Sequence, residues 1–495
     1  MKIIVNSIRG KFHNCPPSLA RKIAKSCRYR AYNYQFSDAF IDGRWDGYVN
    51  KFSVKTATFP SGLLNRIIKI LKKEKAKFKV IDERHKLIWK NDLVLKNIDN
   101  FGYVLRDYQI DGLIIGLNNP YMVFWWATSS GKTVQFAAFC SALKRKEFRK
   151  TLILVTTKDL AAQHREEMEM MLGEKIGLIE EGRFEPEKIT VAVINTLFNK
   201  AIRKKEKNIL SFLNLIEYLI VDESHHLIDS KTMKAVVNKC TNTVVRHGFS
   251  GTPYSLTTDD IELECLTGPP LSKITMSDLI LGGWVSRPEI TMIHYDYPWM
   301  SGRATYPVAY NSQIVENKIR NSIIVDRAFE EYSINNKIVL ILIRIIKHGK
   351  ILLEMLNQKG LYVGDVEFIH GSSPKIQRKK VKEKMKSGEI GLVIASQIWN
   401  EGIDVPSIDV LVKADGGGGN SVTDSKGVRS VVQQVGRVVR KPVKAGELDV
   451  NNVVENTVKI YDFYDNVHKI LLKHSENRLD TYMMESEFKV KEVKV

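Results

Sequence analysis

The chain has 495 residues, 44% hydrophobic and 26% charged, which is typical of a globular protein with roughly two to four domains. Its apolar runs, such as LILV at 152–155, fall far short of the ~20 residues that cross a bilayer. The first residues also lack the apolar core of a signal peptide, so we expect no membrane association. The five cysteines form no C-x-x-C pair, which argues against a disulfide framework or zinc site and predicts a reducing, cytoplasmic location.

The positive charge is concentrated at the start of the chain. The formal net charge is +19, and residues 1–100 hold 22 Lys and Arg against 8 Asp and Glu, so they carry +14 and leave only +5 for the rest. Such an uneven block predicts a module that meets a polyanion such as DNA. A solvated basic surface without a partner is the alternative.

Residues 1–97 are predicted to form this basic module as a small α/β domain. A helix is expected after Pro16-Pro17, and GRWDGYVNKF (43–52) is interpreted as a strand, a turn at Asp46-Gly47 and a second strand. In SGLLNRIIKIL the apolar residues at 63, 64, 67, 68 and 71 have helical spacing, with lysines on the opposite face. Arg44, Trp45 and Lys51 flank the expected turn and are candidate DNA contacts, although Trp45 also fits a core position.

Two segments of alternating strands and helices follow, and each predicts a parallel sheet covered by helices. The first spans residues 98–285, with apolar strands at MVFWWA, TLILVTT, ITVAVINT, YLIVDE and VVRHGFSGT. The second spans 286–462, with IVLILI, VEFIHG, GLVIAS, DVLVKA and VKIYDF, and a glycine-rich loop at 415–427. A helix broken by Gly282-Gly283 is expected to connect them, and a helical tail is expected over 463–495. The fold class is therefore α/β with two tandem parallel-sheet domains.

The stretch WWATSSGKTV (125–134) predicts a phosphate-binding loop between a strand and a helix. Trp126 stands where the loop pattern asks for its first glycine, and Ser129 where many related loops have another. Lys132 would reach the β and γ phosphates of ATP, and Thr133 would bind Mg²⁺. The nucleotide-contacting candidates from this loop are Thr128, Ser129, Ser130, Gly131, Lys132 and Thr133.

The apolar strand YLIV is followed by DESHHL (222–227), about ninety residues after Lys132. It resembles the DExH box of superfamily 2 helicases. The resemblance implies that Asp222 holds Mg²⁺, that Glu223 orients or deprotonates the attacking water, and that His225 couples the site to the second domain. An acidic strand end facing solvent is the alternative.

Weaker elements follow in the order of that superfamily. LRDYQ (105–109) resembles its adenine-reading element, which implies that Arg106, Tyr108 and Gln109 bind the base. Thr157 and Thr196 match elements that grip nucleic-acid phosphates. Ser250-Gly251-Thr252 resembles the coupling motif.

The C-terminal half supplies the remaining elements. ILIRIIKHG (341–349) and IASQIWNEGIDVP (394–406) resemble strand-contacting motifs, which implies DNA contacts from Arg344, His348 and Ser396 and cleft positions for Gly402 and Asp404. The sequence QQVGRVVRK places three catalytic candidates, Gln433, Arg437 and Arg440, on one helical face. Arginines at such positions can stabilise a γ phosphate.

Taken over the whole chain, the pattern is similar to the phage UvsW recombination helicase family. The basic N-terminal stretches GRWDGYVNKF and TFPSGLLNRIIKIL, the loop WATSSGKT and the tail KILLKHSENRLDTYMMESEF carry this resemblance. It implies two RecA-like domains and an ATP- and Mg²⁺-dependent motor that remodels branched, duplex and single-stranded DNA. It also implies a monomer in the host cytoplasm, where other replication or recombination proteins are possible partners. An RNA helicase, a restriction-type translocase and an inactive DNA-binding scaffold are the alternatives.

Overall fold

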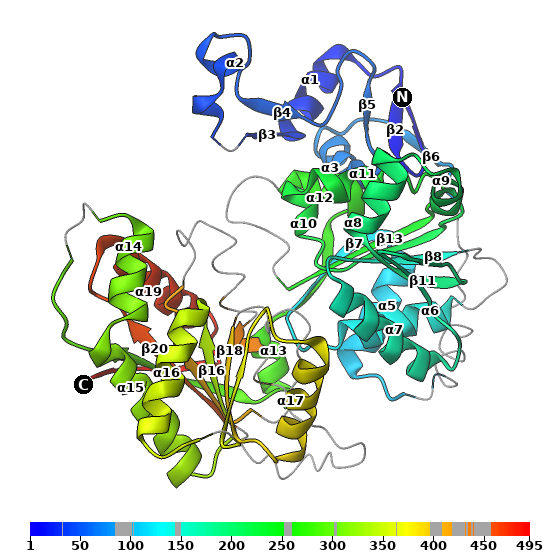
Figure 1. Ribbon diagram of the computed structural model, residues 1–495. Coiled ribbons are helices and arrows are strands. Elements are labelled where there is room, and N and C mark those ends of the chain that lie inside the picture. Colours follow the sequence, from blue (N-terminus) through cyan, green and yellow to red (C-terminus); the bar gives the residue numbers. More distant parts are fainter. Residues whose placement is uncertain are drawn as a thin grey trace. The chain divides into compact units, whose positions relative to one another are not determined.

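The computed structural model describes residues 1–31, 33–84, 101, 103–143, 150–251, 260–300, 304–362, 364–396, 408–417, 431, 434–436, 439 and 457–495 (Figure 1). The chain divides into two compact units. The first contains Met1–Trp126 and Gly131–Ile274, and the second contains Ala127–Ser130 and Thr275–Val495. None of the helices in the described part of the chain combines the length and apolar character that a membrane crossing requires.

The first unit opens with the small α/β domain. Its four-stranded sheet has the order β5-β2-β1-β6, and a separate two-stranded ladder joins β3 to β4. The elements are β1 (Lys2–Val5), β2 (Arg9–His13), α1 (Pro17–Ser26), β3 (Arg28–Arg30), η1 (Tyr34–Phe36), α2 (Asp38–Ile41), β4 (Tyr48–Asn50), β5 (Thr58–Pro60), η2 (Ser61–Leu63), α3 (Leu64–Lys73) and β6 (Lys79–Asp82). The predicted α3 is confirmed, with Leu64, Ile67 and Leu71 buried.

The hairpin predicted at Asp46-Gly47 is wrong. The strand β4 pairs antiparallel with the distant β3, in the register Arg30↔Tyr48, and not with the residues just before the turn. The Arg28 guanidinium lies over the Tyr48 ring at 4.0 Å from its centroid. These Arg–Tyr contacts favour the long-range pairing.

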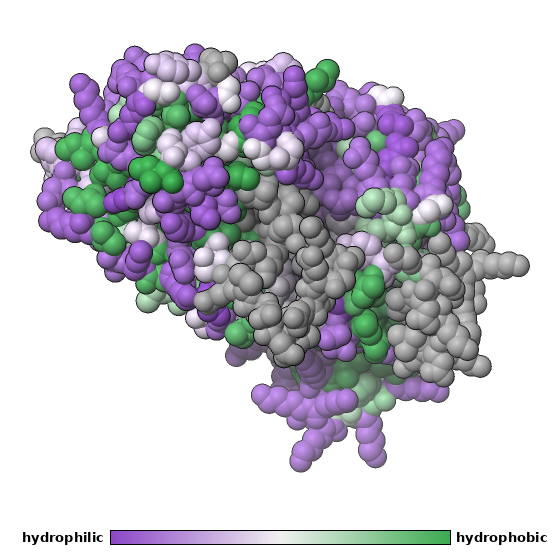
Figure 2. All heavy atoms as spheres, turned by 90° about the horizontal axis from the view of Figure 1, so that it is seen from below, coloured by the Kyte–Doolittle hydropathy of each residue, from purple (hydrophilic) through white to green (hydrophobic). Residues whose placement is uncertain are grey.

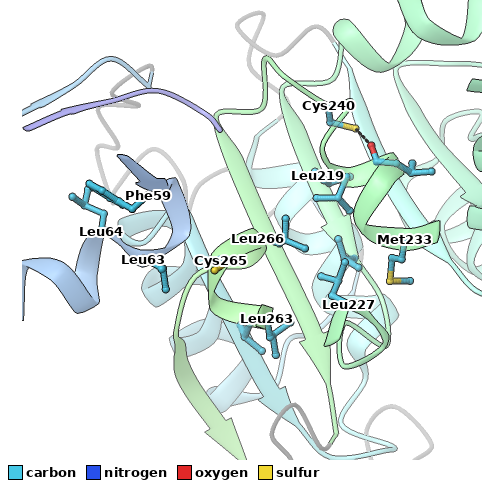
Figure 3. Packing of buried hydrophobic residues seen from close by; sticks show 14 of the residues in the cluster. Phe59, Leu63, Leu64, Leu219, Leu227, Met233, Cys240, Leu263, Cys265 and Leu266 are labelled. Atoms are coloured by element: carbon cyan, nitrogen blue, oxygen red, sulfur yellow. Dashed lines mark hydrogen bonds between the residues drawn. The ribbon is translucent and has the colours of Figure 1, made fainter. Parts of the chain in front are cut away.

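The small domain shares a hydrophobic core with the rest of the first unit. Gly62 packs so closely on the helix α12 (Asp260–Thr267) that a Cβ there would lie 1.9 Å from the Glu264 carbonyl oxygen. Figure 3 shows Leu63 beside α12, which carries Leu263, Cys265 and Leu266 of the same cluster. Arg66 fixes the contact with a two-pronged ion pair to Glu264, through Nε to Oε2 at 2.8 Å and Nη2 to Oε1 at 2.7 Å.

The larger sheet of the first unit has eight strands in the order β10-β9-β11-β8-β12-β13-β7-β14. Only β10 and β9 pair antiparallel, and the central strands are fully buried Val-, Ile- and Leu-rich runs, as expected for a sheet covered on both faces. Its elements are α5 (Asp107–Asn118), β7 (Tyr121–Trp126), α6 (Lys132–Ala142), β8 (Thr151–Val155), α7 (Lys158–Leu172), β9 (Gly177–Glu180), β10 (Arg183–Glu185), β11 (Ile189–Val193), α8 (Ile194–Leu197), η3 (Phe198–Arg203), α9 (Lys207–Asn214), β12 (Tyr218–Val221), α10 (His226–Asp229), α11 (Lys231–Val237), β13 (Val245–Ser250), α12 and β14 (Pro270–Ile274).

The second unit contains a seven-stranded, all-parallel sheet in the order β17-β18-β16-β19-β20-β15-β21. The five strands predicted here are present as β16 to β20. The expected helical tail contains α19 and then a strand, β21, which completes the sheet edge beside β15. The elements are α13 (Met276–Leu281), β15 (Arg287–His294), α14 (Tyr306–Tyr310), η4 (Asn311–Val315), α15 (Lys318–Phe329), η5 (Glu330–Ile334), β16 (Val339–Ile343), α16 (Ile346–Gln358), β17 (Val366–Ile369), α17 (Lys375–Ser387), β18 (Leu392–Ser396), β19 (Val410–Lys413), β20 (Thr457–Tyr464), α19 (Lys469–Met483) and β21 (Lys489–Lys494).

Candidate nucleotide site

Three neighbouring strands of the first unit end in the predicted motifs. In the sheet order, β13 lies between β12 and β7, and all three run parallel. The loop that leads to Lys132 follows β7, the DESH sequence follows β12, and Ser250 ends β13. Parallel strands place their carboxyl ends at one edge, which is where ligands bind in open α/β sheets.

The loop geometry explains which glycines are needed. Gly131 has φ +75° and immediately precedes α6, and a Cβ there would lie 2.6 Å from the Gln109 amide nitrogen. Ser129 also has a left-handed φ of +70°, a conformation that glycine adopts without strain. This conformation gives a physical reason for glycine at the corresponding place in many related loops.

Trp126 can occupy the position of the first glycine because its side chain packs in the hydrophobic core. It is fully buried, and its Nε1 donates a hydrogen bond to Ser272 Oγ at 2.8 Å. A Cβ at Gly112 of α5 would come within 2.5 Å of the indole ring. The bulky side chain therefore points into the fold and leaves the loop itself to small residues.

A chain of polar contacts links the loop lysine to the coupling motif. Lys132 Nζ lies 3.2 Å from Glu223 Oε1, and Glu223 Oε2 lies 3.3 Å from His225 Nδ1. The same imidazole nitrogen is 2.9 Å from Ser250 Oγ. The structure therefore brings together residues that lie more than a hundred positions apart.

Glu223 is a strained and electrostatically tuned residue. Burial would raise its pKa, but the Lys132 ammonium and the His225 imidazole hold that pKa well below the ordinary glutamate value. Its φ of +45° is unusual for a residue with a side chain. Backbone strain of this kind costs on the order of 1–3 kcal/mol and is concentrated at functional sites.

The predicted metal ligands meet on a residue that the sequence did not single out. Thr133 Oγ1 lies 3.0 Å from His164 Nδ1, and Asp222 Oδ2 lies 3.0 Å from His164 Nε2. Asp222 Oδ1 accepts the Glu223 backbone N–H at 2.9 Å. A hydroxyl and a carboxylate beside a helix N-terminus fit Mg²⁺, which binds proteins through one or two carboxylates and completes its shell with phosphates.

In the predicted adenine-binding element, Gln109 is buried and Tyr108 is half-buried. Gln109 is buried; its Oε1 accepts the Arg106 N–H at 3.0 Å, and its Nε2 is 3.5 Å from the Gly131 carbonyl oxygen. Tyr108 is half-buried against Trp126, and its hydroxyl accepts from Arg106 Nη1 at 2.8 Å. These contacts place the element directly beside the phosphate loop.

Two predicted phosphate contacts line one pocket of the first unit. Thr157 caps the N-terminus of α7, and Thr196 lies on α8, which follows the neighbouring strand β11. The pocket also contains four cations and one acid, Lys158, Lys200, Arg203, Lys204 and Glu181. Its excess positive charge suits a phosphate chain.

The predicted DNA contacts outside this pocket have different surroundings. Arg44 is exposed and pairs with Asp42, whereas Trp45 is half-buried and donates from Nε1 to the Tyr48 carbonyl at 2.8 Å. Lys51 pairs with the buried Glu262 of α12. Lys51 thus helps to dock the small domain, which explains its position without DNA.

The three DNA contacts predicted in the second unit differ in exposure. Arg344 is exposed and donates to the Tyr306 hydroxyl at 2.9 Å, and Ser396 is buried at the end of β18. His348 corrects a prediction, because it is fully buried and its Nε2 lies 2.8 Å from Asn321 Oδ1. A buried imidazole in the core cannot contact a phosphate.

The remaining predicted residues lie in the loop after β7 or outside the described residues. Thr128, Ser129 and Ser130 belong to the second unit, in which the Ser129 hydroxyl donates to the Gly436 carbonyl at 2.5 Å. Gly402, Asp404, Gln433, Arg437 and Arg440 lie outside the described residues. Their roles stay predictions.

Comparison with known proteins identifies two domains. Residues 96–255 match the family described as "Type III restriction enzyme, res subunit", and residues 323–442 match "Helicase conserved C-terminal domain". A DNA 3'-5' helicase, Rad25, of Haloarcula marismortui is 25% identical over 350 residues, 68% of this chain and 50% of that protein. The DNA 3'-5' translocase XPB2 of Sulfurisphaera tokodaii is 23% identical over 379 residues, 69% of this chain and 79% of that protein. The chain spans about half the length of the first of these relatives.

Solved structures share the fold. The helicase MrfA bound to DNA and AMPPNP aligns with a TM-score of 0.57 at 14% identity, over 82% of this chain and 55% of that one. Dbp5 of S. cerevisiae bound to RNA and ADP BeF3 aligns with a TM-score of 0.53 at 16% identity, over 81% and 93%. T4 UvsW aligns over 100% of this chain and 99% of that chain, at 19% identity and a TM-score of 0.46. With both helicase domains matched and the loop and DESH motifs at one sheet edge, the chain resembles the superfamily 2 helicases and has their two RecA-like domains.

Proposed function

We propose that this protein is an ATP- and Mg²⁺-dependent DNA motor that moves on duplex and single strands and remodels branched DNA. The observation that carries the proposal is the docking of the basic small domain onto α12 of the first RecA-like domain. Because the two share one core, DNA held by the small domain is held by the same unit that carries Lys132 and Glu223. The UvsW-like pattern of the sequence and the DNA-specific names of the Rad25 and XPB2 relatives point the same way.

The catalytic work falls to residues already in contact. The α6 N-terminus and Lys132 would bind the phosphates, and Thr133 and Asp222 would hold Mg²⁺, which when bound neutralises phosphate charge. In the resting site Lys132 holds Glu223 as a weakly basic carboxylate. When Lys132 turns to a phosphate, Glu223 loses its main partner and regains basicity toward a water molecule.

The DNA-binding surface of the small domain is proposed to lie on α1 and α3. Both helices contribute to the shared hydrophobic cluster, α1 with Leu19 and Ile23 and α3 with Leu71, and Lys22 pairs with Glu74 at 2.5 Å. Their outer faces expose Arg21, Lys22, Lys25, Lys69, Lys72 and Lys73. This surface replaces the predicted turn as the main contact, because Arg44 and Lys51 are already paired with acids there.

The experiment compares ATPase stimulation by single-stranded DNA, duplex, a four-way junction and RNA at two salt concentrations. We expect the junction to stimulate most. Stronger stimulation by RNA would indicate an RNA helicase, stimulation that grows with the length of an unbranched duplex would indicate a restriction-type translocase, and no stimulation would leave an inactive scaffold.

The surface itself is tested by Lys69→Gln/Lys72→Gln/Lys73→Gln. Each lost phosphate contact lowers the slope of log affinity against log salt by about 0.9, so three lost contacts lower it by about 2.7 for duplex DNA. The matched control is Lys379→Gln/Lys380→Gln/Lys386→Gln on α17, which removes three exposed lysines elsewhere. Equal slopes for the two triple variants would contradict the assignment of α1 and α3. Deleting the small domain is a poorer test, because it would expose the shared core.

A further inference from the structure

His164 stands between the two predicted metal ligands. It lies on α7 and is 5% exposed, and its ring packs against Phe136 with centroids 5.5 Å apart. One ring nitrogen contacts Thr133 and the other contacts Asp222, each at 3.0 Å. None of the sequence motifs gives this residue a role.

The two partners define how the ring is used. A carboxylate can only accept, so Nε2 must carry a proton and donate it to Asp222 Oδ2. In the singly protonated ring, Nδ1 is then an acceptor and takes the hydrogen of the Thr133 hydroxyl. The lone pairs of Thr133 Oγ1 stay available to a cation. A donor at Nδ1 would occupy one of them.

The ring also completes the orientation of Asp222. Oδ1 of that carboxylate is already fixed by the Glu223 N–H at 2.9 Å, so the contact with His164 orients the second oxygen. Outer hydrogen bonds of this kind set the direction and basicity of metal ligands, and losing one typically lowers metal affinity by about 10–100-fold.

We propose that His164 is a positioning residue for Mg²⁺: it holds Thr133 and Asp222 so that their oxygens face the cation together. The proposal rests on the proposed ATP function of the same site. It assigns to His164 no contact with nucleotide and no part in the transfer of the phosphate.

The test measures binding of a fluorescent N-methylanthraniloyl derivative of ATP to the full chain, with Mg²⁺ titrated from zero in the presence of a constant nucleotide concentration. In His164→Phe the ring packing on Phe136 is kept and both hydrogen bonds are lost. We expect the Mg²⁺ concentration for half-maximal binding to rise about 10–100-fold. Binding without Mg²⁺ should change less than about twofold. His164→Gln keeps one donor and one acceptor and should recover part of the loss. Glu166→Gln, exposed on the same helix, is the control.

The outcomes distinguish failure of the proposed ATP function from failure of the role of His164. If the wild type binds no nucleotide at all, the proposed function fails and the role of His164 fails with it. If the wild type binds, the role of His164 is overturned by an unchanged Mg²⁺ requirement in His164→Phe, or by equal losses with and without Mg²⁺, which mark a purely structural residue. A lower Mg²⁺ requirement would also overturn it, since the ring would then compete with the cation for its place.

Discussion

Each unit contains a cluster of charged residues, and the two clusters differ in burial and in backbone strain. In the first unit, Lys132 and Glu223 form a half-buried pair, and Glu223 has a φ of +45°. In the second unit, Arg478 and Asp462 are fully buried and joined by Nε contacts of 3.2 and 2.9 Å.

The cluster of the second unit fixes its chain ends. Arg478 of α19 donates to Asp462 of β20 and to the Phe463 and Gly417 carbonyls. Arg320 of α15 donates to Asp465 and to the Ala414 carbonyl. The tail thereby becomes part of the sheet domain.

Both clusters contain the same residue types, so backbone strain and position in the sheet are what distinguish a candidate site from a structural cluster. The first cluster has a positive φ at Glu223 and lies at the ends of the sheet strands. In the second cluster Arg320, Asp462, Asp465 and Arg478 have no positive φ, and they pair with each other and with backbone carbonyls. Backbone strain is tolerated where a ligand uses it. The face of the molecule shown in Figure 2 is mostly hydrophilic, with small separate hydrophobic groups.

The largest effect is expected from breaking the scaffold cluster with Arg478→Met. Removing one partner of a buried pair leaves Asp462 charged without compensation, which costs about 3–5 kcal/mol. Hydrogen exchange of the β19 and β20 amides, followed by mass spectrometry, measures the loss as a lower opening free energy. Lys350→Met, an exposed change on α16, is the control. Equal protection in the two variants would show that the cluster does not stabilise the unit.

The next effect separates catalysis from stability at the first cluster. Lys132→Ala should lower the ATPase kcat by about 10²–10³-fold, the loss typical for one preorganised electrostatic group. DNA binding and the hydrogen exchange of β7 should stay near wild type, because this lysine is not part of the core. Lys231→Ala, on the exposed surface of the same unit, is the control. Turnover that survives the change would show that the loop does not bind the phosphates.

The elements with strong periodicity could be predicted from the sequence. The buried strands and α3 follow their apolar patterns, because burial alone decides those positions. The β3–β4 ladder could not, since its partners lie about twenty residues apart and are selected by Arg–Tyr contacts that appear only after folding. The strand β21 was missed because its pattern, KVKEVK, is that of a polar sheet edge.

The candidate site residues also differ in how well the sequence predicts them. The placement of Lys132, Thr133, Asp222 and Glu223 at one sheet edge was predictable, because the chemistry proposed for them requires a short local pattern after a strand. His164 was not, because its contacts with Thr133 and Asp222 depend on α7 packing against α6 and the sheet, and its signal in the sequence is a polar residue on an otherwise apolar helix face. Arg478 and Asp462 gave no signal, since charged residues on a helix and a strand end are usually solvated.

The smallest predicted effect concerns His348, which was expected at a DNA surface and belongs to the scaffold. Burial, together with the nearby Arg320 charge, lowers its pKa from 6.5 to about 3. The unfolded chain binds a proton below pH 6.5 that the folded chain excludes, so stability is lost as the pH falls from 6.5 toward 3. Between pH 7 and pH 5 the loss from this residue is about 2 kcal/mol. His348→Gln keeps a donor toward Asn321 but does not titrate. Urea unfolding at both pH values should therefore show a weaker pH dependence in the variant by about 2 kcal/mol. The same pH dependence in both proteins would mean that solvent reaches the imidazole. His348 would then again be a possible DNA contact.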